Sequence, residues 1–258
     1  MIPARYISLL SVLLLAGESL ATPPLQLTST EQAVLRGHPV WRLAGGAKPP
    51  FQWIDNKGHF QGMAEDYRQL IQLRASIRLD PVGAESWSQS LEQLRRHDCD
   101  VVLLITQTAD RDAYLLFTDP VLTLPGAIIT RSDNKAIKAI SDLAGREVVV
   151  ARNRAIHEKL AREHPEMVLE PRDDIASALS AVALGDADAF VGDLFSATEA
   201  IDRLGLRNLK IPGDSPYTDP FRIGVRNDWP EAISILNKAI ATISPQEQLQ
   251  GRTAMLAG

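Results

Sequence analysis

The stretch Val101-Val102-Leu103-Leu104-Ile105-Thr106-Gln107-Thr108-Ala109-Asp110-Arg111 decides the fold of this chain. Its first five residues form an unbroken apolar run, which is typical of a strand buried on both faces of a parallel sheet. The hydroxyl-rich continuation then leaves the carboxyl end of that strand, where open α/β sheets bind ligands. An arginine at this place can hold a carboxylate through two parallel N–H bonds, although the local sequence of Arg111 alone slightly favours a solvated loop residue.

Strands and helices alternate around this stretch in two similar series. For the first series, apolar runs and helical periodicity predict strands at 40–44, 77–82 and 100–105, a hairpin at 51–62, and helices at 32–37, 63–76 and 86–97. For the second series, the same signals predict strands at 147–151, 168–172, 189–191 and 209–211, a helical turn at 141–145, and helices at 155–164, 174–184 and 194–204. The β-α-β-α-β order favours a parallel sheet in each series.

Two segments connect the series. Residues 122–130 are predicted to be extended, residues 212–220 to form a turn-rich loop, and residues 221–226 to be a strand that leads to a last helix on the first series. Two crossings predict a hinged clamshell with a ligand between its lobes. We expect lobe 1 to comprise residues 26–125 and 222–258, and lobe 2 to comprise residues 126–221.

The N-terminus has the features of a secretory signal peptide. Arg5 supplies a positive charge, residues 7–16 are apolar, and Ser19-Leu20-Ala21 places small residues at the positions that a signal peptidase reads. The apolar run is too short for an ordinary transmembrane helix. We therefore expect residues 1–21 to be removed by cleavage after Ala21 and the remaining chain to be periplasmic.

Composition and charge argue against several kinds of site. The 258 residues are 45% hydrophobic with a formal net charge of −5, and no basic cluster points to nucleic acid. Cys99 is the single cysteine, so no intramolecular disulfide can form, and its place before a strand predicts a buried residue. His157 and His164 have no partner at metal-ligand spacing, so we expect neither a metal nor a cofactor.

A set of short motifs follows a fixed order along residues 31–244. The motifs are Pro49-Pro50-Phe51, Gly58-x-x-x-Gly62-x-x-x-Asp66, Asp100, Thr108-x-x-Arg111, Phe117-Thr118-x-Pro120, Leu143-x-Gly145, Gly185-x-Ala187-Asp188-Ala189-x-x-x-Asp193 and Val225-Arg226-x-Asp228. Together they resemble the family 3 extracellular solute-binding proteins, the amino-acid class of periplasmic binding protein. The resemblance implies the type II periplasmic-binding-protein clamshell, an α/β fold with two lobes joined by two hinge strands.

Further features look like the Venus-flytrap sensory domains of bacterial virulence sensor kinases. These features are His38-Pro39, Ser86-Trp87, Asp228-Trp229-Pro230-Glu231 and Ile235-Leu236-Asn237-Lys238-Ala239. Sensory domains of this kind are normally followed by a transmembrane helix and a cytoplasmic region, and neither follows here. Two interpretations remain open, namely a free binding protein and a fragment of a sensor. The resemblance implies a membrane permease, or a sensor kinase or cyclase, as the partner.

The resemblance assigns the two ends of an amino acid to the two lobes. Arg111 matches the arginine that clamps the ligand α-carboxylate, and Thr106 matches a hydroxyl position that adds hydrogen bonds. Asp193 matches the aspartate that receives the α-amino group, although its place between a strand and a helix also suits an N-cap. Because Arg111 and Asp193 belong to different lobes, a zwitterion satisfies both only when the cleft is shut.

Other candidate contacts and departures concern the side-chain end of a ligand. Phe51 and Trp53 lie in a loop that lines the pocket in the family, although aromatic residues there are more often core. Arg154 stands at a helix start where relatives often donate N–H groups, and it either holds an acidic group or faces solvent. Lys48 replaces an aromatic residue of many relatives and Val121 replaces a tyrosine, which leaves the ligand side chain open.

Three classes of function are compatible with a clamshell of this kind. The leading hypothesis is a solute-binding protein or sensory domain that closes on a small ligand, an amino acid, for signalling or ABC-type uptake. The alternative is a clamshell that has lost its ligand and acts by protein contact. A dehydratase-like enzyme on the same fold would need a carboxylate acid and base near Arg111, and every candidate has a role that the fold already explains, so we expect no enzymatic activity.

Overall fold

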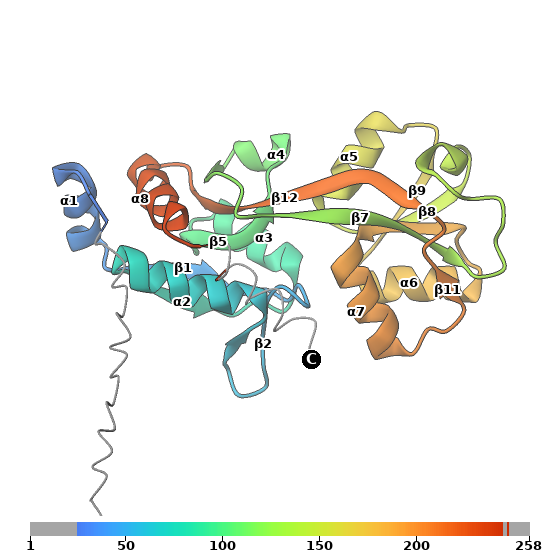
Figure 1. Cartoon of the computed structure of the whole chain (residues 1–258), viewed down its shortest axis with the longest axis horizontal. Helices are drawn as coiled ribbons and strands as arrows, with labels where there is room; N and C mark the ends of the chain where they lie inside the picture. Colours follow the sequence, from blue (N-terminus) through green and yellow to red (C-terminus); the bar gives the residue numbers. More distant parts are fainter. Residues whose placement is uncertain (1–24, 245–246, 248–258) are drawn as a thin grey trace, which may run out of the picture.

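The computed structural model describes residues 25–244 and residue 247, so the predicted signal peptide at 1–21 lies outside the described residues. Within the described part, ten strands form one mixed sheet in the order β4-β1-β5-β12-β7-β10-β8-β9, with β11 on β7 and β6 on β12. Figure 1 shows two α/β lobes that are joined by the long strands β7 (Leu122–Arg131) and β12 (Asp214–Arg226). The predicted clamshell is confirmed, whereas the residue boundaries of the lobes remain predictions.

Lobe 1 is built on parallel strands. β1 (Val40–Ala44) lies between β4 (Arg78–Val82) and β5 (Val101–Thr106) and pairs with both. The other elements of this lobe are α1 (Ser29–Gly37), β2 (Trp53–Ile54), β3 (Phe60–Gln61), α2 (Met63–Ala75), α3 (Trp87–Arg95) and α8 (Pro230–Ala241). Ile235 of α8 shares a core with Leu43 of β1, so the last helix returns to the first lobe as predicted.

Lobe 2 repeats this arrangement. β8 (Glu147–Ala151) lies between β10 (Ala189–Asp193) and β9 (Val168–Arg172) and pairs in parallel with both. The other elements are η1 (Ile140–Leu143), α5 (Ala155–Glu163), α6 (Ile175–Leu184), α7 (Leu194–Leu204) and β11 (Leu209–Lys210). Val149 of β8 packs into one core cluster and Val148 into another, which explains why this strand is continuously apolar.

The prediction of a turn-rich loop at 212–220 is wrong, because most of this stretch is strand. β12 begins at Asp214 and pairs antiparallel with β7, with Thr218 opposite Pro125. A register shift between Asp214 and Thr218 gives the irregularity at which proline is tolerated in a sheet. Pairing with a neighbour therefore overrides the local turn residues, and the two crossings form one two-stranded hinge.

Two short elements after β5 were not predicted. Thr108 caps the single-turn helix α4 (Ala109–Asp112) by accepting a hydrogen bond from the Arg111 N–H, as threonine often does at a helix start. β6 (Leu115–Phe117) then pairs antiparallel with β12. This turn carries Arg111 away from the strand end and directs it toward the gap between the lobes.

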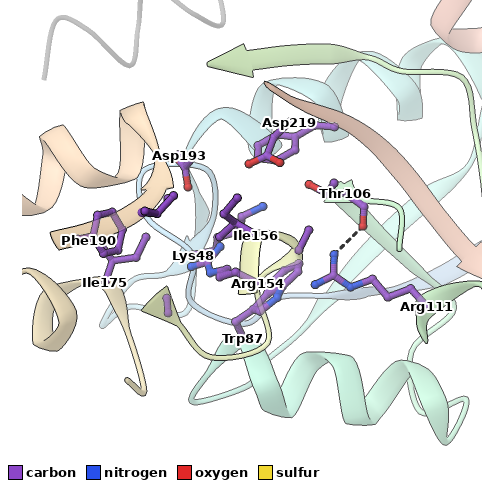
Figure 2. Close-up of a pocket in the computed structure, with 15 residues that line it drawn as sticks. Lys48, Trp87, Thr106, Arg111, Arg154, Ile156, Ile175, Phe190, Asp193 and Asp219 are labelled. Atoms are coloured by element: carbon purple, nitrogen blue, oxygen red, sulfur yellow. Dashed lines mark hydrogen bonds between the residues drawn. The ribbon is translucent and has the colours of Figure 1, made fainter. Parts of the chain in front are cut away.

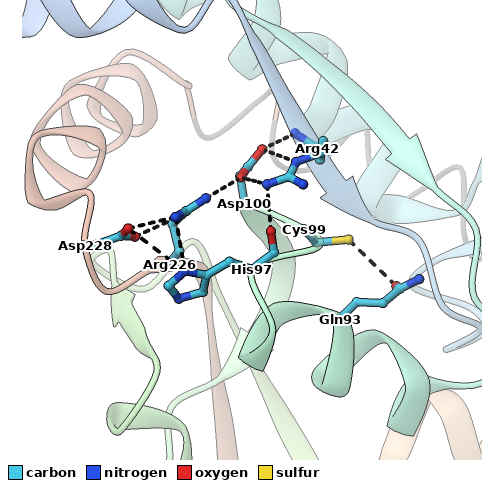
Figure 3. Close-up of polar contacts among 7 residues, drawn as sticks. All are labelled: Arg42, Gln93, His97, Cys99, Asp100, Arg226 and Asp228. Carbon is cyan, nitrogen blue, oxygen red and sulfur yellow. Dashed lines mark hydrogen bonds and ion pairs between the residues drawn. The ribbon is translucent and has the colours of Figure 1, made fainter.

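A buried carboxylate holds three strands of lobe 1 together. Asp100 accepts hydrogen bonds from the backbone N–H, Nε and Nη2 of Arg42 at 2.8, 3.0 and 2.6 Å, and Arg226 Nη1 approaches it at 3.2 Å. Figure 3 shows Arg226 between Asp100 and Asp228. Burial alone raises the pKa of Asp100, but the bonds from Arg42 and Arg226 outweigh it, and the net pKa is lowered.

Cys99 lies beside this cluster and is fully buried, as the sequence predicted. Its thiol approaches Gln93 Oε1 at 3.7 Å (Figure 3). Burial raises the pKa of the Cys99 thiol to about 12. Because the thiolate is the reactive form, Cys99 is an inert core residue.

Candidate functional site between the lobes

A small cavity lies between the two lobes. Its volume is about 20 Å³, room for one water molecule. Two larger pockets of about 290 Å³ each flank it and share lining residues with it, among them Trp87 and Arg154 on one side and Thr106 and Asp219 on the other. The cavity is therefore the closed centre of a cleft that opens on both sides.

Arg111 lies inside this cleft and is only 2% exposed, so it is not a solvated loop arginine. Nη1 donates a hydrogen bond of 2.5 Å to the carbonyl oxygen of Thr106, and Nη2 donates one of 2.8 Å to the carbonyl oxygen of Asn153 in lobe 2. Nε is buried and has no partner in the described part of the chain. Burial lowers the pKa of the Arg111 guanidinium.

Asp193 lines the same cavity from lobe 2. It ends β10, is 7% exposed, and accepts a hydrogen bond of 2.7 Å from the Ser196 N–H, which caps α7. Asp193 therefore both caps α7 and lines the cavity. Asp188, in contrast, directly precedes β10 at its other end, where it accepts a hydrogen bond from the Glu147 N–H and faces Arg146.

Arg154 is half-buried and lines the cavity, so that its role in holding an acidic group stays a prediction. It precedes α5 but makes no side-chain cap. Its guanidinium lies 5.6 Å from the Trp87 ring centroid, and its Nη1 is buried without a partner in the described residues. Burial lowers the pKa of Arg154 to about 10, although the Asp193 carboxylate opposes this shift.

Two charged residues of the cavity were missed as site residues. Asp219 lies on β12, in the stretch expected to be a loop, and burial together with the charge of Asp193 raises its pKa. Lys48 was noted only as a departure from an aromatic residue. It is 4% exposed, and its Nζ donates a hydrogen bond of 2.8 Å to the carbonyl oxygen of Leu104.

The remaining predicted contacts divide into two groups. Thr106 lines the cavity, and its carbonyl oxygen holds Arg111. Phe51 and Trp53 do not line it: Phe51 is fully buried in the core of lobe 1, edge-on to Phe221 at 4.9 Å, and Trp53 lies in the small hairpin. The expectation of cavity contact therefore needs correction for both, because the Phe51 ring packs against Phe221 in the core and Trp53 pairs with Gln61 in the hairpin.

Figure 2 shows the charged side chains gathered around the cavity. Three cations, Lys48, Arg111 and Arg154, face two carboxylates, Asp193 and Asp219. Arg111 Nε, Arg154 Nη1 and Trp87 Nε1 are buried donors without a partner in the described residues. A buried donor without an acceptor is costly, so the arrangement suits a ligand with carboxylate oxygens at the cationic side and a positive group at the aspartates.

The described residues contain no group of three or more His, Cys, Asp or Glu side chains that could hold a metal ion. No helix in the described part of the chain combines the length and the apolar character needed to cross a membrane.

Sequence comparisons place the chain among binding proteins and sensors. The bacterial extracellular solute-binding proteins, family 3, match residues 43–253. The chain is 29% identical to the virulence sensor protein BvgS of Bordetella pertussis over 223 residues, which are 85% of this chain and 18% of BvgS. It is 33% identical to the putative amino-acid ABC transporter-binding protein PatH of Vibrio harveyi over 182 residues, which are 70% of each chain. The chain thus spans less than a fifth of the length of BvgS.

Solved structures agree with this placement. The periplasmic VFT2 domain of Bordetella pertussis BvgS superposes with a TM-score of 0.79 at 27% identity, over 89% of this chain and 99% of that domain. An ancestral arginine-binding protein bound to arginine superposes with a TM-score of 0.73 at 22% identity, over 84% of this chain and 98% of that one. The second likeness concerns the fold alone.

Proposed function

Because the chain belongs to the bacterial extracellular solute-binding proteins, family 3, we propose that it binds a small carboxylate ligand, an amino acid, between its two lobes. The family is one of binding proteins, so the chain is not an enzyme. Its fold is that of a Venus-flytrap sensory domain. The identity of the ligand and that of the partner protein are what we propose.

One observation carries the proposal, namely the arrangement of charge across the cleft. Arg111 and Arg154 carry buried N–H groups that need an acceptor, and the carboxylates of Asp193 and Asp219 line the same cavity. A ligand α-carboxylate would supply acceptors to Arg111, and a second acidic group of the ligand would supply them to Arg154. Each bond to a charged group contributes about 1.5 to 3 kcal/mol. The ligand ammonium would lie at Asp193, with Thr106 beside the carboxylate.

Ligand entry requires the lobes to separate. The closed cavity of about 20 Å³ holds one water molecule, far less than an amino acid needs. We propose that the movement occurs at the two hinge strands β7 and β12, between lobe 1 at 26–125 and 222–258 and lobe 2 at 126–221. A ligand that bridges the lobes binds the closed state more tightly than the open one, and thereby shifts the equilibrium toward closure.

We place the protein in the periplasm, exported by the signal peptide at 1–21, and favour sensing over uptake. The similarity to BvgS covers 85% of the chain and supports a sensory role, with a sensor kinase or cyclase as partner. The similarity to PatH keeps ABC-type uptake through a membrane permease as the second role. Genes next to this one distinguish the two roles, since a kinase or cyclase gene supports sensing, and a permease with an ATPase supports uptake.

A thermal-shift screen of the common amino acids tests the ligand. An amino acid at 100 times its Kd adds about 2.7 kcal/mol of stability, or at least about 5 °C in Tm for a chain of this size. Arg111→Ala should abolish the shift. Arg96→Ala, which removes an exposed arginine at the C-cap of α3 paired with Glu92, should leave it unchanged.

The second candidate is a clamshell that acts by protein contact alone. The observation that favours it is the filling of the cleft by the chain's own Lys48 and Arg154. The same screen decides between the two candidates, because no amino acid would shift the Tm of a cleft that no longer admits a ligand.

A further inference from the structure

We propose that Lys48 is a built-in occupant of the side-chain end of the cleft, which excludes cationic ligands and assigns that end to an anionic group. The inference deepens the proposed function and rests on it only for the choice of ligand. The occupancy of the cleft by Lys48 is a separate claim about this chain alone.

Three aromatic rings surround the Lys48 ammonium. Its Nζ lies 3.9 Å from the ring centroid of Phe221, 4.9 Å from that of Trp87 and 5.1 Å from that of Phe51. All three distances lie within the range in which a cation is attracted to an aromatic face. The rings come from β12, α3 and the loop after β1, and together they form a cage that would suit a small cation. In this chain the Lys48 ammonium occupies the cage.

The backbone supplies the hydrogen-bond acceptor for this ammonium. Leu104 has φ +50°, a conformation that is a rare outlier for a bulky residue. The pairing of β5 with β12 is irregular at the same place, with a register shift between Arg222 and Gly224. The distortion leaves the Leu104 carbonyl oxygen pointing at Lys48 Nζ, 2.8 Å away, so cage and acceptor together fix the lysine.

The charges near the cage determine which ligand fits. Arg154 also lies over the Trp87 ring, so two cations flank the same indole (Figure 2). Burial lowers the pKa of Lys48 well below its ordinary value and the neighbouring Arg154 lowers it further, while Asp193 opposes both. A ligand carboxylate between the two cations would relieve their repulsion, whereas a lysine or arginine side chain would add a third cation and find its cage taken.

Chemical rescue tests the occupancy directly. Lys48→Ala removes a propylammonium fragment, so n-propylammonium chloride should raise the Tm of Lys48→Ala and leave the wild type unchanged. Lys48→Met, which fills the cage without a charge, should not respond. Lys57→Ala, at an exposed lysine in the turn between β2 and β3, should behave as the wild type. Equal responses of all four proteins would overturn the occupancy.

A measurement on the wild type covers the case in which Lys48→Ala fails to fold. Protons on the Cε of a lysine enclosed by three rings are shifted upfield by the ring currents. One lysine Cε–Hε signal should therefore lie clearly upfield of the others in a ¹H–¹³C spectrum, and it should disappear in Lys48→Met. A spectrum in which all lysine signals coincide would show that the ammonium is not in the cage.

Calorimetric titration tests the ligand class. The wild type should bind L-glutamate or L-aspartate at least about tenfold more tightly than L-arginine or L-lysine, and Lys48→Ala should reverse this order. An unchanged order would overturn the specificity role. If propylammonium rescues Lys48→Ala but neither protein binds any amino acid, the occupancy stands and the proposed function fails. If amino acids bind but propylammonium does not rescue Lys48→Ala, the proposed function stands and the occupancy fails.

Discussion

Arg111 Nη2 donates a hydrogen bond of 2.8 Å to the carbonyl oxygen of Asn153, across the gap between the two lobes. Asn153 adds a second bridge, because its Nδ2 donates a bond of 2.7 Å to the Ser88 hydroxyl at the start of α3. Its φ of +58° is a left-handed conformation that asparagine tolerates better than most residues. Asn153 is thus a latch that joins lobe 2 to lobe 1.

Removing the side-chain half of this latch should favour the open clamshell. Ser88→Ala and Asn153→Gly each remove the bond while keeping the backbone conformation, since glycine accepts a positive φ. Each change should destabilise the closed state relative to the open state by about 1 kcal/mol. The shift should appear as a larger radius of gyration in small-angle X-ray scattering. Ser180→Ala, which removes only a bond within α6, is the control, and equal radii for all proteins would contradict the latch.

Asp193→Asn separates the ligand role of this residue from its cap. Asparagine caps helices as well as aspartate does, so the free energy of unfolding should change by less than about 0.5 kcal/mol. Loss of the charge facing a ligand ammonium should weaken amino-acid binding by at least about 30-fold, equivalent to 2 kcal/mol. Asp193→Ala should also lose the cap, at about 1 kcal/mol. Full binding by Asp193→Asn would assign the residue to the cap alone.

Glu31 gives lobe 1 a defined pH dependence. Its carboxyl group lies in the first turn of α1 and accepts hydrogen bonds from Lys238 and Ser234. These bonds, chiefly those from Lys238, lower the pKa of Glu31 from 4.5 to about 2. Because the pKa of Glu31 is lower in the folded state than in the unfolded state, the ionised carboxylate stabilises the fold above the unfolded pKa. This stabilisation is lost as the pH falls from about 4.5 to 2. Relative to Glu31→Gln, which retains a residue able to complete the capping box, the wild type should lose on the order of 1 kcal/mol in this window. Parallel stability curves for the two proteins would contradict this.

Asp100→Ala should destabilise lobe 1 strongly. The carboxylate is buried and holds Arg42 and Arg226, so its removal leaves Arg226 only partly solvated and should cost about 2 to 4 kcal/mol in urea unfolding. Asp80→Ala, which breaks an exposed pair with Arg78, should cost less than about 1 kcal/mol. Similar losses in the two variants would show that burial of the Asp100 pair is unimportant.

The fold was predictable where the sequence repeats a strong local signal. The bounds of β1, β8 and β9 agree with the predicted strands at 40–44, 147–151 and 168–172, because apolar runs bounded by turn residues identify short buried strands. The start of β12 was not predictable, since only pairing with β7, some ninety residues earlier in the sequence, makes a strand of a segment rich in turn residues.

The candidate site was predictable only in part, for the same reason. The place of Arg111 after an apolar strand pointed to the cleft, and Asp193 also followed a strand. Asp219 and Lys48 carry no local signal, because their positions depend on β12 and on the irregular pairing at Leu104. Phe51 lies three residues after Lys48 in the sequence, but its ring packs edge-on against Phe221 in the core of lobe 1, which sequence spacing does not reveal.

The central claim is that Arg111 and Asp193 hold the two charged ends of an amino acid. Calorimetric titration tests it most directly, with the amino acid selected by the thermal-shift screen and its two analogues that lack the α-carboxylate or the α-amino group. Each analogue should bind the wild type at least about 30-fold more weakly, and Arg111→Ala should no longer distinguish the ligand from the analogue without the carboxylate. Equal affinities for all three compounds, or no binding of any amino acid, would contradict the account.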